Sequence, residues 1–586
     1  MLKILAKQIK QYKKTALFTA FCTIAEVALE IALPLVTASI IDKGIQTGEL
    51  KNVFLYGFLM LLLAAASLTM GILAGRFAAK ASTGFAKNLR DAMYQKIQTF
   101  SFANIDKFST AGLVTRMTTD VTHMQTAFQM LTRMCLRAPI TLILALIMAF
   151  AINGKVASVF LVAILFLGTI LGLIVSLAMK SFQKMFECYD ELNGNIRENV
   201  AAIRVVKAFV REDYEKVKFK KAADKLYDFS VKAEKIISFN NPVMNLTVYA
   251  SMIGISWMSA QMIVAGEMTT GNLTSLFSYC MNILFSLMML SIVFVMMTMS
   301  IASAKRIAEV LKEESDIVSP ENACTEVADG SVSFENVSFT YSKKSRKGKN
   351  ILNDITLDIK SGETIGIIGG TGSGKTSFIN LISRLYDATE GSVKVGGIDV
   401  REYDLQALRN QVSVVLQKNE LFSGTVLENL RWGKEDATLE ECIAVCKMAC
   451  ADDFIQRMPE QYDTHIERGG ANVSGGQKQR LCIARALLKK PKILILDDST
   501  SAVDTATDAR IRKAFREEIP NTTKFIISQR ISSIEDADRI IVLDNGSVSG
   551  FDTHENLLAN NDIYRAIYEG QTQGGGDFDE PKEGGE

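Results

Sequence analysis

Six long apolar segments constrain this 586-residue chain more than any other feature of its sequence. They lie near residues 16–41, 53–78, 135–152, 157–179, 243–265 and 273–299. A helix needs about 20 predominantly apolar residues to cross a hydrocarbon core of about 30 Å. Buried helices of soluble proteins seldom stay apolar over such lengths, so a soluble helical protein is the less favoured alternative. The sequence therefore predicts an α-helical membrane domain with six transmembrane helices.

The connections between these segments alternate in length and in charge. Those at 42–52, 153–156 and 266–272 are short, whereas those at 79–134 and 180–242 are long and rich in Lys and Arg. By the positive-inside rule, the long connections and both termini are predicted to face the cytosol. Few helix breakers interrupt the long connections, so we expect the membrane helices to continue well into the cytosol.

Some side chains within the spans leave two interpretations open. Glu26 and Glu30 lie one turn apart in the first span, and Arg76 lies late in the second. The carboxylates either attract cationic cargo or pair with polar groups of neighbouring helices, and we favour the second interpretation. The methionines of the sixth span suit either an adaptable ligand surface or ordinary packing. They are Met281, Met288, Met289, Met296, Met297 and Met299.

The composition changes after the sixth span. A charged linker rich in breakers occupies 311–330, and alternating strand patterns begin at 332. We therefore expect a membrane domain over 1–310, a soluble α/β domain over 331–570 and a disordered, acidic tail over 571–586.

The net charge of +1 argues against a nucleic-acid partner. The nine cysteines lack disulfide or zinc spacing, and Cys442, Cys446 and Cys450 on one helical face predict ordinary packing.

A glycine-rich motif marks a phosphate site in the soluble domain. An apolar strand at 364–368 leads into Gly-Gly-Thr-Gly-Ser-Gly-Lys-Thr, which fits the P-loop pattern. The loop's N–H groups converge on phosphate oxygens, Lys375 adds positive charge, and the Thr376 hydroxyl coordinates magnesium. A helix expected at 376–385 adds its positive N-terminal end. The predicted ATP ligands are Gly369, Gly370, Thr371, Gly372, Ser373, Gly374, Lys375 and Thr376.

Two further motifs accompany the P-loop. A second apolar strand at 492–496 leads into Asp497-Asp498, so that a carboxylate emerges at a strand end and can hold magnesium or its waters. Asp497 is the expected metal ligand. The motif between the two strands opens a helix and consists of Ser474, Gly475, Gly476 and Gln477. Alone it could be a helix cap, but the three motifs in this order separate the chain from other P-loop enzymes.

With these motifs, nearly the whole chain resembles a half-transporter of the ATP-binding cassette exporter family. The resemblance implies a type IV exporter-like membrane domain, an α/β P-loop NTPase cassette, and ATP and Mg²⁺ as cofactors. It implies that Tyr341 stacks on adenine and that Gln417 senses magnesium, as a ligand, and the attacking water. It also assigns 501–504 to the loop between two ATP sites, 467–470 to a contact with the membrane domain, and 116–125 and 208–217 to coupling helices.

The resemblance implies a dimer as well. Family members place two cassettes head to tail, so that each ATP lies between one chain's P-loop and the other chain's Ser-Gly-Gly-Gln signature. The expected partner is a second half-transporter, and a monomer would hold no complete site.

The chain departs from the family pattern at two positions. Most members have glutamate as the general base where this chain has Asp498, and histidine as the switch residue where it has Gln529. Removal of one methylene shortens the side chain by about 1.5 Å, and misplacement by about 1 Å can slow a reaction about 100-fold. We therefore expect Asp498, Gln529 and Gln417 to form an impaired catalytic site. The intact signature would complete an active site on a different partner chain.

These observations predict an ATP hydrolase coupled to export, with its own P-loop site slow, in a bacterial-type plasma membrane. The expected cargo is a small or amphipathic compound, and multidrug export is the family's commonest assignment. The alternatives are a mainly regulatory subunit that holds ATP and an exporter of lipid or peptide. An importer is less favoured, because importers of this class usually have separate membrane and cassette chains.

Overall fold

The computed structural model describes residues 1–341, 350–498 and 503–572. The chain forms two compact units, one with Met1–Thr99 and Phe108–Glu313 and the other with Phe100–Lys107 and Glu314–Glu586. The second unit thus includes a short segment that stands between two membrane helices in the sequence. Residues 501 and 502 of the expected loop and 573–586 of the expected tail lie outside the described residues.

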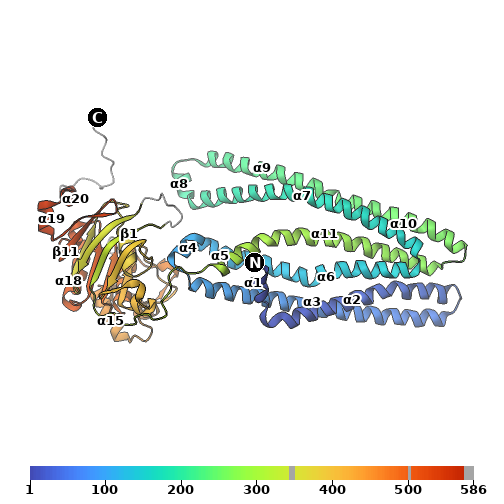
Figure 1. Ribbon diagram of the computed structural model, residues 1–586, viewed down its shortest axis with the longest axis horizontal. Coiled ribbons are helices and arrows are strands. Elements are labelled where there is room, and N and C mark those ends of the chain that lie inside the picture. The colour runs from blue at the N-terminus through green and yellow to red at the C-terminus, as the bar shows by residue number, and fades with distance from the viewer. Residues whose placement is uncertain (342–349, 499–502, 573–586) are drawn as a thin grey trace. The chain divides into compact units, whose positions relative to one another are not determined.

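The first unit contains six helices that are long and apolar enough to cross a membrane, which confirms the predicted number of spans. Figure 1 shows them running lengthwise beside one another. The helices are α2 (Lys13–Ile40), α3 (Leu50–Gln98), α6 (Val121–Ile152), α7 (Gly154–Ala201), α10 (Asn240–Val264) and α11 (Thr270–Lys312). The 49 residues of α3 extend over about 74 Å, more than twice the hydrocarbon thickness. The long helices therefore continue beyond a bilayer, as the sequence predicts.

Local chemistry explains where these helices begin and how they pack. The Asn153 side chain caps α7 by accepting from the N–H groups of Lys155 and Val156. Pro34 lies inside α2, and α11 bonds the backbone around it: Ser275 donates to the Pro34 carbonyl at 2.7 Å, and Tyr279 donates to that of Ile31 at 2.9 Å. Such bonds satisfy polar groups that lipid cannot.

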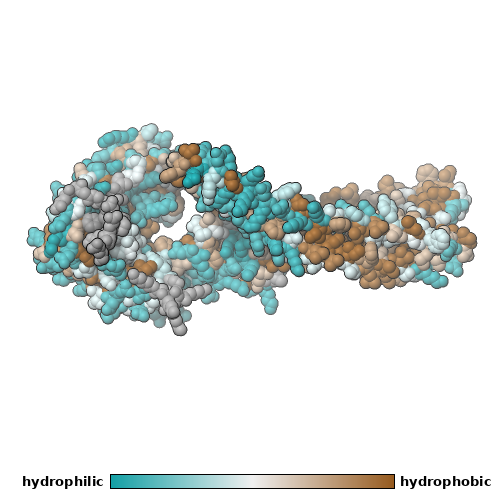
Figure 2. Space-filling view, turned by 90° about the horizontal axis from the view of Figure 1, so that it is seen from above, coloured by the Kyte–Doolittle hydropathy of each residue, from teal (hydrophilic) through white to brown (hydrophobic). Residues whose placement is uncertain are grey.

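The surface of the membrane unit matches its helices. Hydrophobic side chains gather along one stretch of the helical unit in Figure 2, and hydrophilic side chains cover the rest of its length. Large exposed apolar residues of these helices include Phe54 and Phe58 on α3, Val162 and Leu165 on α7, and Trp257 on α10. Apolar patches of this size mark contact with lipid or with protein.

Shorter elements precede the first long helix or lie between the long helices. They are α1 (Leu2–Lys7), η1 (Lys10–Tyr12), the π-helical η2 (Ile41–Ile45), α4 (Phe102–Phe108), α5 (Thr110–Thr115), the π-helical η3 (Arg116–Asp120), α8 (Ile203–Ala208) and α9 (Glu212–Ser238). The expected coupling region 116–125 is η3 and the start of α6 in the membrane unit, whereas Phe100–Lys107 belongs to the cassette unit. The expected region 208–217 falls at the end of α8 and the start of α9. The break between α8 and α9 thus lies inside the second expected region.

Two sheets organise the second unit. The six-stranded sheet has the order β12-β11-β3-β10-β9-β6, in which all neighbours are parallel except β11 and β12. A four-stranded antiparallel sheet has the order β2-β1-β4-β5, and β7 pairs with β8. The strands are β1 (Val332–Phe339), β2 (Leu352–Ile359), β3 (Thr364–Ile368), β4 (Glu390–Val395), β5 (Ile398–Asp399), β6 (Val412–Val415), β7 (Gly424–Thr425), β8 (His465–Ile466), β9 (Ile493–Asp497), β10 (Thr523–Ile527), β11 (Arg539–Asp544) and β12 (Ser547–Asp552). Parallel strands place their carboxyl ends at one edge, where α/β proteins bind ligands.

Helices cover these sheets. They are α12 (Lys375–Ile382), η4 (Val400–Glu402), α13 (Leu405–Gln411), α14 (Val426–Arg431), α15 (Leu439–Met448), α16 (Asp452–Ile455), η5 (Gln461–Asp463), η6 (Arg468–Gly470), α17 (Gly475–Leu487), α18 (Thr505–Glu518), η7 (Ile531–Ser533), α19 (His554–Asn560) and α20 (Asp562–Thr572). Cys442, Cys446 and Cys450 are buried in the core that α15 and α17 share. They contribute to packing there, as the sequence predicts.

Several expected boundaries differ from the observed ones. Helix α11 continues through Lys312, past the expected linker start at 311, and α12 begins at Lys375 and ends at Ile382 rather than spanning 376–385. The second apolar strand, β9, runs from Ile493 through Asp497. The expected tail begins at 571, yet Gln571 lies in α20 and donates to the Gln529 carbonyl at 2.6 Å.

Candidate ATP site

The P-loop follows β3 and leads directly into α12. Gly374 precedes the helix with φ 99°, a left-handed conformation that favours glycine. A Cβ at Gly369 would approach the Leu543 carbonyl oxygen at 2.1 Å, so only glycine fits there. The Lys375 ammonium donates to the carbonyls of Gly369 at 2.7 Å and Gly370 at 2.9 Å. The lysine is therefore held over the loop, where it can meet phosphate oxygens.

An oxygen pair beside the P-loop suits a hard cation. The Thr376 hydroxyl donates to the Asp497 carboxylate, at 3.1 Å to Oδ2 and 3.3 Å to Oδ1, and Asp497 is 2% exposed. Burial raises the pKa of Asp497 above its ordinary value and the neighbouring Asp498 adds to the increase, while Thr376 and Lys375 oppose it. A hydroxyl and a buried carboxylate supply oxygen ligands of the kind that Mg²⁺ prefers, so the residues fit this ion.

The two departures from the family pattern meet at the same sheet edge. Gln529, two residues after β10, donates from Nε2 to Asp498 Oδ2 at 3.4 Å. Burial raises the pKa of Asp498, against the effects of Lys375, a hydrogen bond with Gln417 and the charge of Arg530. The structure thus brings Asp498, Gln529 and Gln417 together.

The backbone at Asp498 has an unusual conformation. Its φ is 46°, in the left-handed region, where aspartate and asparagine are enriched over most other non-glycine residues. The Asp498 amide donates to the Ile527 carbonyl at 3.1 Å. The buried Gln479 side chain, from α17, donates to the Asp498 carbonyl at 3.3 Å. These bonds hold the conformation that the short side chain favours.

Tyr341 presents an open ring next to the P-loop helix. The ring is 47% exposed, and its hydroxyl lies 3.0 Å from the Ser377 hydroxyl of α12. Phe339 and Tyr386 meet it edge to face, with centroid distances of 4.8 and 4.9 Å. An exposed ring fixed from its edges can stack on a planar base.

The signature motif caps α17. The Ser474 hydroxyl accepts from the Gln477 N–H at 3.3 Å, and the Gln477 side chain accepts from the Ser474 N–H at 2.8 Å. Gly475 and Gly476 form the first turn. This capping box presents a hydroxyl and backbone N–H groups at a helix N-terminus, which suits phosphate oxygens.

Two neighbouring expected segments are also placed. Residues 467–470 enter η6, and the Glu467 N–H donates to Asn472 Oδ1 at 2.9 Å. Of the expected 501–504 loop, the described part ends in Asp504, whose carboxylate caps α18 by accepting from the Thr507 N–H at 2.9 Å. The sequence motifs did not predict the contact of Gln479 with Asp498 or that of Tyr386 with Tyr341, because both contacts join residues that are far apart in the sequence.

In the membrane unit, Glu26 and Glu30 pair with one cation. The Arg137 guanidinium donates to Glu26 at 2.6 Å and to the two Glu30 oxygens at 2.8 and 2.7 Å. The pairing joins α2 to α6, which agrees with the favoured interpretation of these carboxylates. Arg76 is exposed on α3. Met281 and Met288 pack against the apolar core, whereas the Met299 side chain lies outside the described part of the chain.

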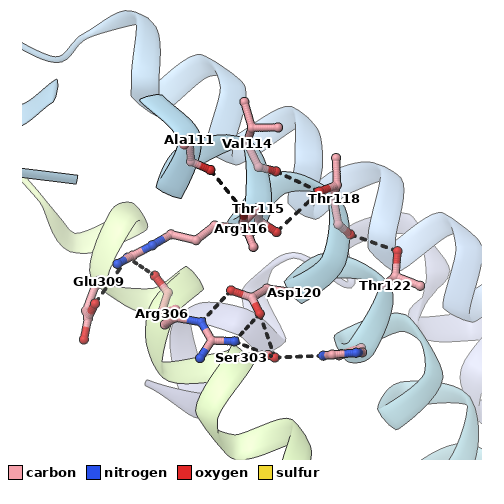
Figure 3. Close-up of polar contacts among 11 residues, drawn as sticks. Ala111, Val114, Thr115, Arg116, Thr118, Asp120, Thr122, Ser303, Arg306 and Glu309 are labelled. Carbon is pink, nitrogen blue, oxygen red and sulfur yellow. Dashed lines mark hydrogen bonds and ion pairs between the residues drawn. The ribbon is translucent and has the colours of Figure 1, made fainter. Parts of the chain in front are cut away.

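A second polar cluster joins η3 and the start of α6 to the C-terminal part of α11 (Figure 3). The fully buried Asp120 accepts from Arg306 Nε at 2.7 Å, from Arg306 Nη2, and from the Ser303 hydroxyl at 2.9 Å. His123 lies 3.2 Å from the same hydroxyl. Arg116 donates to the Arg306 carbonyl at 2.7 Å and to Glu309 at 3.2 Å. The cluster pairs every carboxylate in it with an arginine.

Comparison with known proteins agrees with this architecture. The family model for the ABC transporter transmembrane region matches residues 16–288, and the ABC transporter model matches 352–501. An uncharacterized ABC transporter ATP-binding protein of Bacillus subtilis, YfiB, is 35% identical over 96% of this chain and 97% of its own length. An ATP-dependent lipid A-core flippase of Desulfotalea psychrophila is 31% identical over 97% and 99%.

A solved structure has the same fold. It is described as a bacterial Atm1-family ABC exporter with ATP bound, and it covers 96% of this chain and 100% of that chain with a TM-score of 0.83 and 24% identity. The six apolar helices thus form an ABC membrane domain, and the α/β unit is an ABC ATPase that binds ATP. Half-transporters of this kind dimerise. The chain therefore belongs to the ABC transporter family, as an ATP-driven exporter half-transporter with an Atm1-like fold.

Proposed function

We propose that this chain exports a small or amphipathic substrate as one subunit of a heterodimeric exporter, and that its own P-loop forms the slower of two ATP sites. The supporting observation is the pair Asp498 and Gln529, whose side chains lie 3.4 Å apart at the edge of the sheet. Asp498 is one methylene shorter than glutamate, and the Gln529 amide cannot carry the positive charge of a protonated histidine. A water-activating base and a phosphate-sensing cation are both altered.

The remaining residues keep the roles that nucleotide binding requires. The P-loop N–H groups and Lys375 bind the phosphates, Tyr341 stacks on adenine, and Ser474–Gln477 complete the partner's site across the dimer interface. Thr376, Asp497 and Gln417 hold Mg²⁺, which neutralises charge on the β- and γ-phosphates when bound. ATP thus stabilises the closed cassette pair, and hydrolysis at the partner's site resets it.

The proposed membrane is a bacterial-type plasma membrane, with the cassette and both termini in the cytosol. The basic residues of the long connections support this orientation through the positive-inside rule. The methionines on α11 support an adaptable apolar surface for amphipathic cargo, because the thioether side chain is flexible and polarisable.

Restoring the family residues tests the impaired site. The isolated chain should hydrolyse ATP slowly, and Asp498→Glu combined with Gln529→His should raise its turnover at least several-fold. The left-handed backbone at Asp498 limits the gain from glutamate. Asp544→Glu, at the exposed end of β11, is the matched control. Rapid ATP turnover by the unmodified isolated chain would refute the proposal.

The signature separates a heterodimer from a simple loss of activity. In the assembled transporter, Ser474→Arg should disable hydrolysis, because the bulky side chain fills the space of the γ-phosphate. Lys375→Ala should leave slow turnover at the partner's site. Thr438→Arg breaks a similar capping box on α15 and controls for loss of a helix cap. If Ser474→Arg lowers ATP hydrolysis less than Lys375→Ala does, the assignment of the active and impaired sites must be reversed.

Two other functions remain as candidates. A regulatory subunit would hold ATP to stabilise the dimer, and equal turnover at the two sites would exclude it. A lipid exporter is favoured by the relative whose printed name is lipid A-core flippase. Reconstitution in vesicles distinguishes the candidates: transfer of labelled lipid between leaflets supports lipid export, whereas uptake of amphipathic dyes without lipid transfer supports the first proposal.

A further inference from the structure

Tyr386 touches the short segment that the membrane helices contribute to the cassette unit. Its hydroxyl donates to Asp106 Oδ2 at 2.6 Å, and its ring meets the Phe102 ring with the centroids 6.1 Å apart. Both partners lie in Phe100–Lys107, which belongs to the compact cassette unit. Ser101 anchors the same segment by donating to Asp316 at 2.7 Å. Tyr386 is thus a point at which the connection between α3 and α6 is fastened.

The other side of Tyr386 touches the aromatic ring expected to stack on adenine. The rings of Tyr386 and Tyr341 lie 4.9 Å apart at 82°, and Phe339 contacts both, at 5.7 Å from Tyr386 and 4.8 Å from Tyr341. Edge-to-face contacts of this kind fix the plane of a ring. The orientation of Tyr341 therefore depends on where Tyr386 lies.

The bond to Asp106 fixes Tyr386 in turn. Burial raises the pKa of Tyr386 well above its ordinary value, and the Asp106 carboxylate adds to the increase. The phenol therefore keeps its proton at physiological pH and remains a donor. A hydroxyl that donates to a carboxylate makes a strong, directional bond.

We propose that Tyr386 is a positioning residue that links the docking of Phe100–Lys107 to the stacking surface for adenine on Tyr341. When the segment is docked, Tyr386 holds the Tyr341 ring in the plane that receives the base. By thermodynamic linkage, ATP bound against Tyr341 stabilises the docked segment by the same factor. This inference rests on the proposed role of Tyr341, and it adds a route from the membrane helices to the base rather than to the phosphates.

The test compares ATP with tripolyphosphate, which binds the P-loop but has no base. In the full-length chain, Tyr386→Ala should weaken ATP binding about 2- to 10-fold, the range that edge-to-face contacts support, and leave tripolyphosphate binding unchanged. Tyr386→Phe keeps the ring contacts but loses the bond to Asp106, so it should weaken ATP binding less than Tyr386→Ala does and should also leave tripolyphosphate binding unchanged. Equal weakening of both ligands, or no weakening of ATP binding, would overturn the proposal.

A second measurement follows the segment itself. ATP should slow hydrogen exchange of the Phe100–Lys107 amides in the unmodified chain. Asp106→Asn and Tyr386→Phe should each lose this protection, and the double variant should lose no more than either single variant. Tyr462→Phe is the matched control, because Tyr462 donates to Asp452 at 2.8 Å elsewhere in the cassette. Persistence of the protection in both variants would contradict the link. If Tyr341→Ala leaves ATP affinity intact, the adenine assignment fails instead.

Discussion

Buried charges are neutralised in different ways in the membrane unit and in the cassette. In the membrane unit, Asp120 is paired with Arg306, and Glu26 and Glu30 are paired with Arg137, all within the chain. At the ATP site, Lys375 rests on backbone carbonyls, and Asp497 accepts only a hydroxyl proton from Thr376 among its described hydrogen bonds. The first arrangement joins helices. The second places an ammonium and a carboxylate beside the P-loop, where a nucleotide and a cation can meet them.

The largest effect is expected where the charge serves the ligand. Lys375→Ala should weaken ATP binding to the isolated chain by about 100-fold or more, because charge-assisted hydrogen bonds contribute about 1.5–3 kcal/mol each. The fold should survive, since the lysine contacts only loop carbonyls among the bonds described for it. Equilibrium binding of a fluorescent ATP analogue measures the loss, and an unchanged dissociation constant would refute the site assignment.

A smaller effect, on stability alone, is expected at the cluster around Asp120. Asp120→Asn should lower the free energy of unfolding by about 1–3 kcal/mol, since the carboxylate is buried but Arg306 is partly exposed to water. Thermal unfolding of the purified chain measures the change. Glu309→Gln removes an exposed partner of Arg116 and should change stability by less than about 1 kcal/mol. If Asp120→Asn weakened ATP binding as much as Lys375→Ala does, the distinction between the charges that join helices and the charges that serve the ligand would be lost.

The two glutamates of α2 should differ from each other. The Glu26 side chain is 8% exposed and that of Glu30 is 36% exposed, so Glu26→Gln should lower the unfolding midpoint more than Glu30→Gln. We expect the free energy of unfolding to fall by about 1–2 kcal/mol in Glu26→Gln and by less than about 1 kcal/mol in Glu30→Gln. The reverse order would indicate that Glu30 carries the contact between α2 and α6.

The smallest effect concerns a buried group that stays neutral. Burial raises the pKa of the Cys446 thiol to about 12, so only about one thiol in 10,000 is ionised at pH 8. Native Cys446 should therefore resist iodoacetamide at pH 8 and react after denaturation. Peptide mass spectrometry measures both states, and fast labelling of the native chain would show that the α15 core opens readily.

The sequence predicts the ATP site better than the membrane clusters for a physical reason. The P-loop and Gln529 follow apolar strands and Asp497 ends one, and parallel strands bring such ends together. Asp120 and Arg306, by contrast, lie in different helices 186 positions apart, and neither stands in a motif. Arg137 was missed as the partner of Glu26 because it lies at the edge of the expected third span. The left-handed backbone of Asp498 likewise depends on bonds from distant residues.

The expected coupling regions show a related limit. Both helix breaks near them occur without proline, and Ser109 caps α5 with φ 55°, a conformation that sequence periodicity does not reveal. The assignment of Phe100–Lys107 to the cassette unit depends on Tyr386 and Asp316. Such tertiary contacts override local helical propensity.

The unbroken length of α11 has a mechanical consequence. Its 43 residues run without a proline from the sixth span to Lys312, and the chain enters the cassette unit at Glu314. A straight helix of that length is a lever of about 65 Å, so a tilt of about 5° swings its far end by about 6 Å, roughly one helical turn. A modest tilt of α11 can therefore produce a displacement as large as a side chain without any bend in the helix.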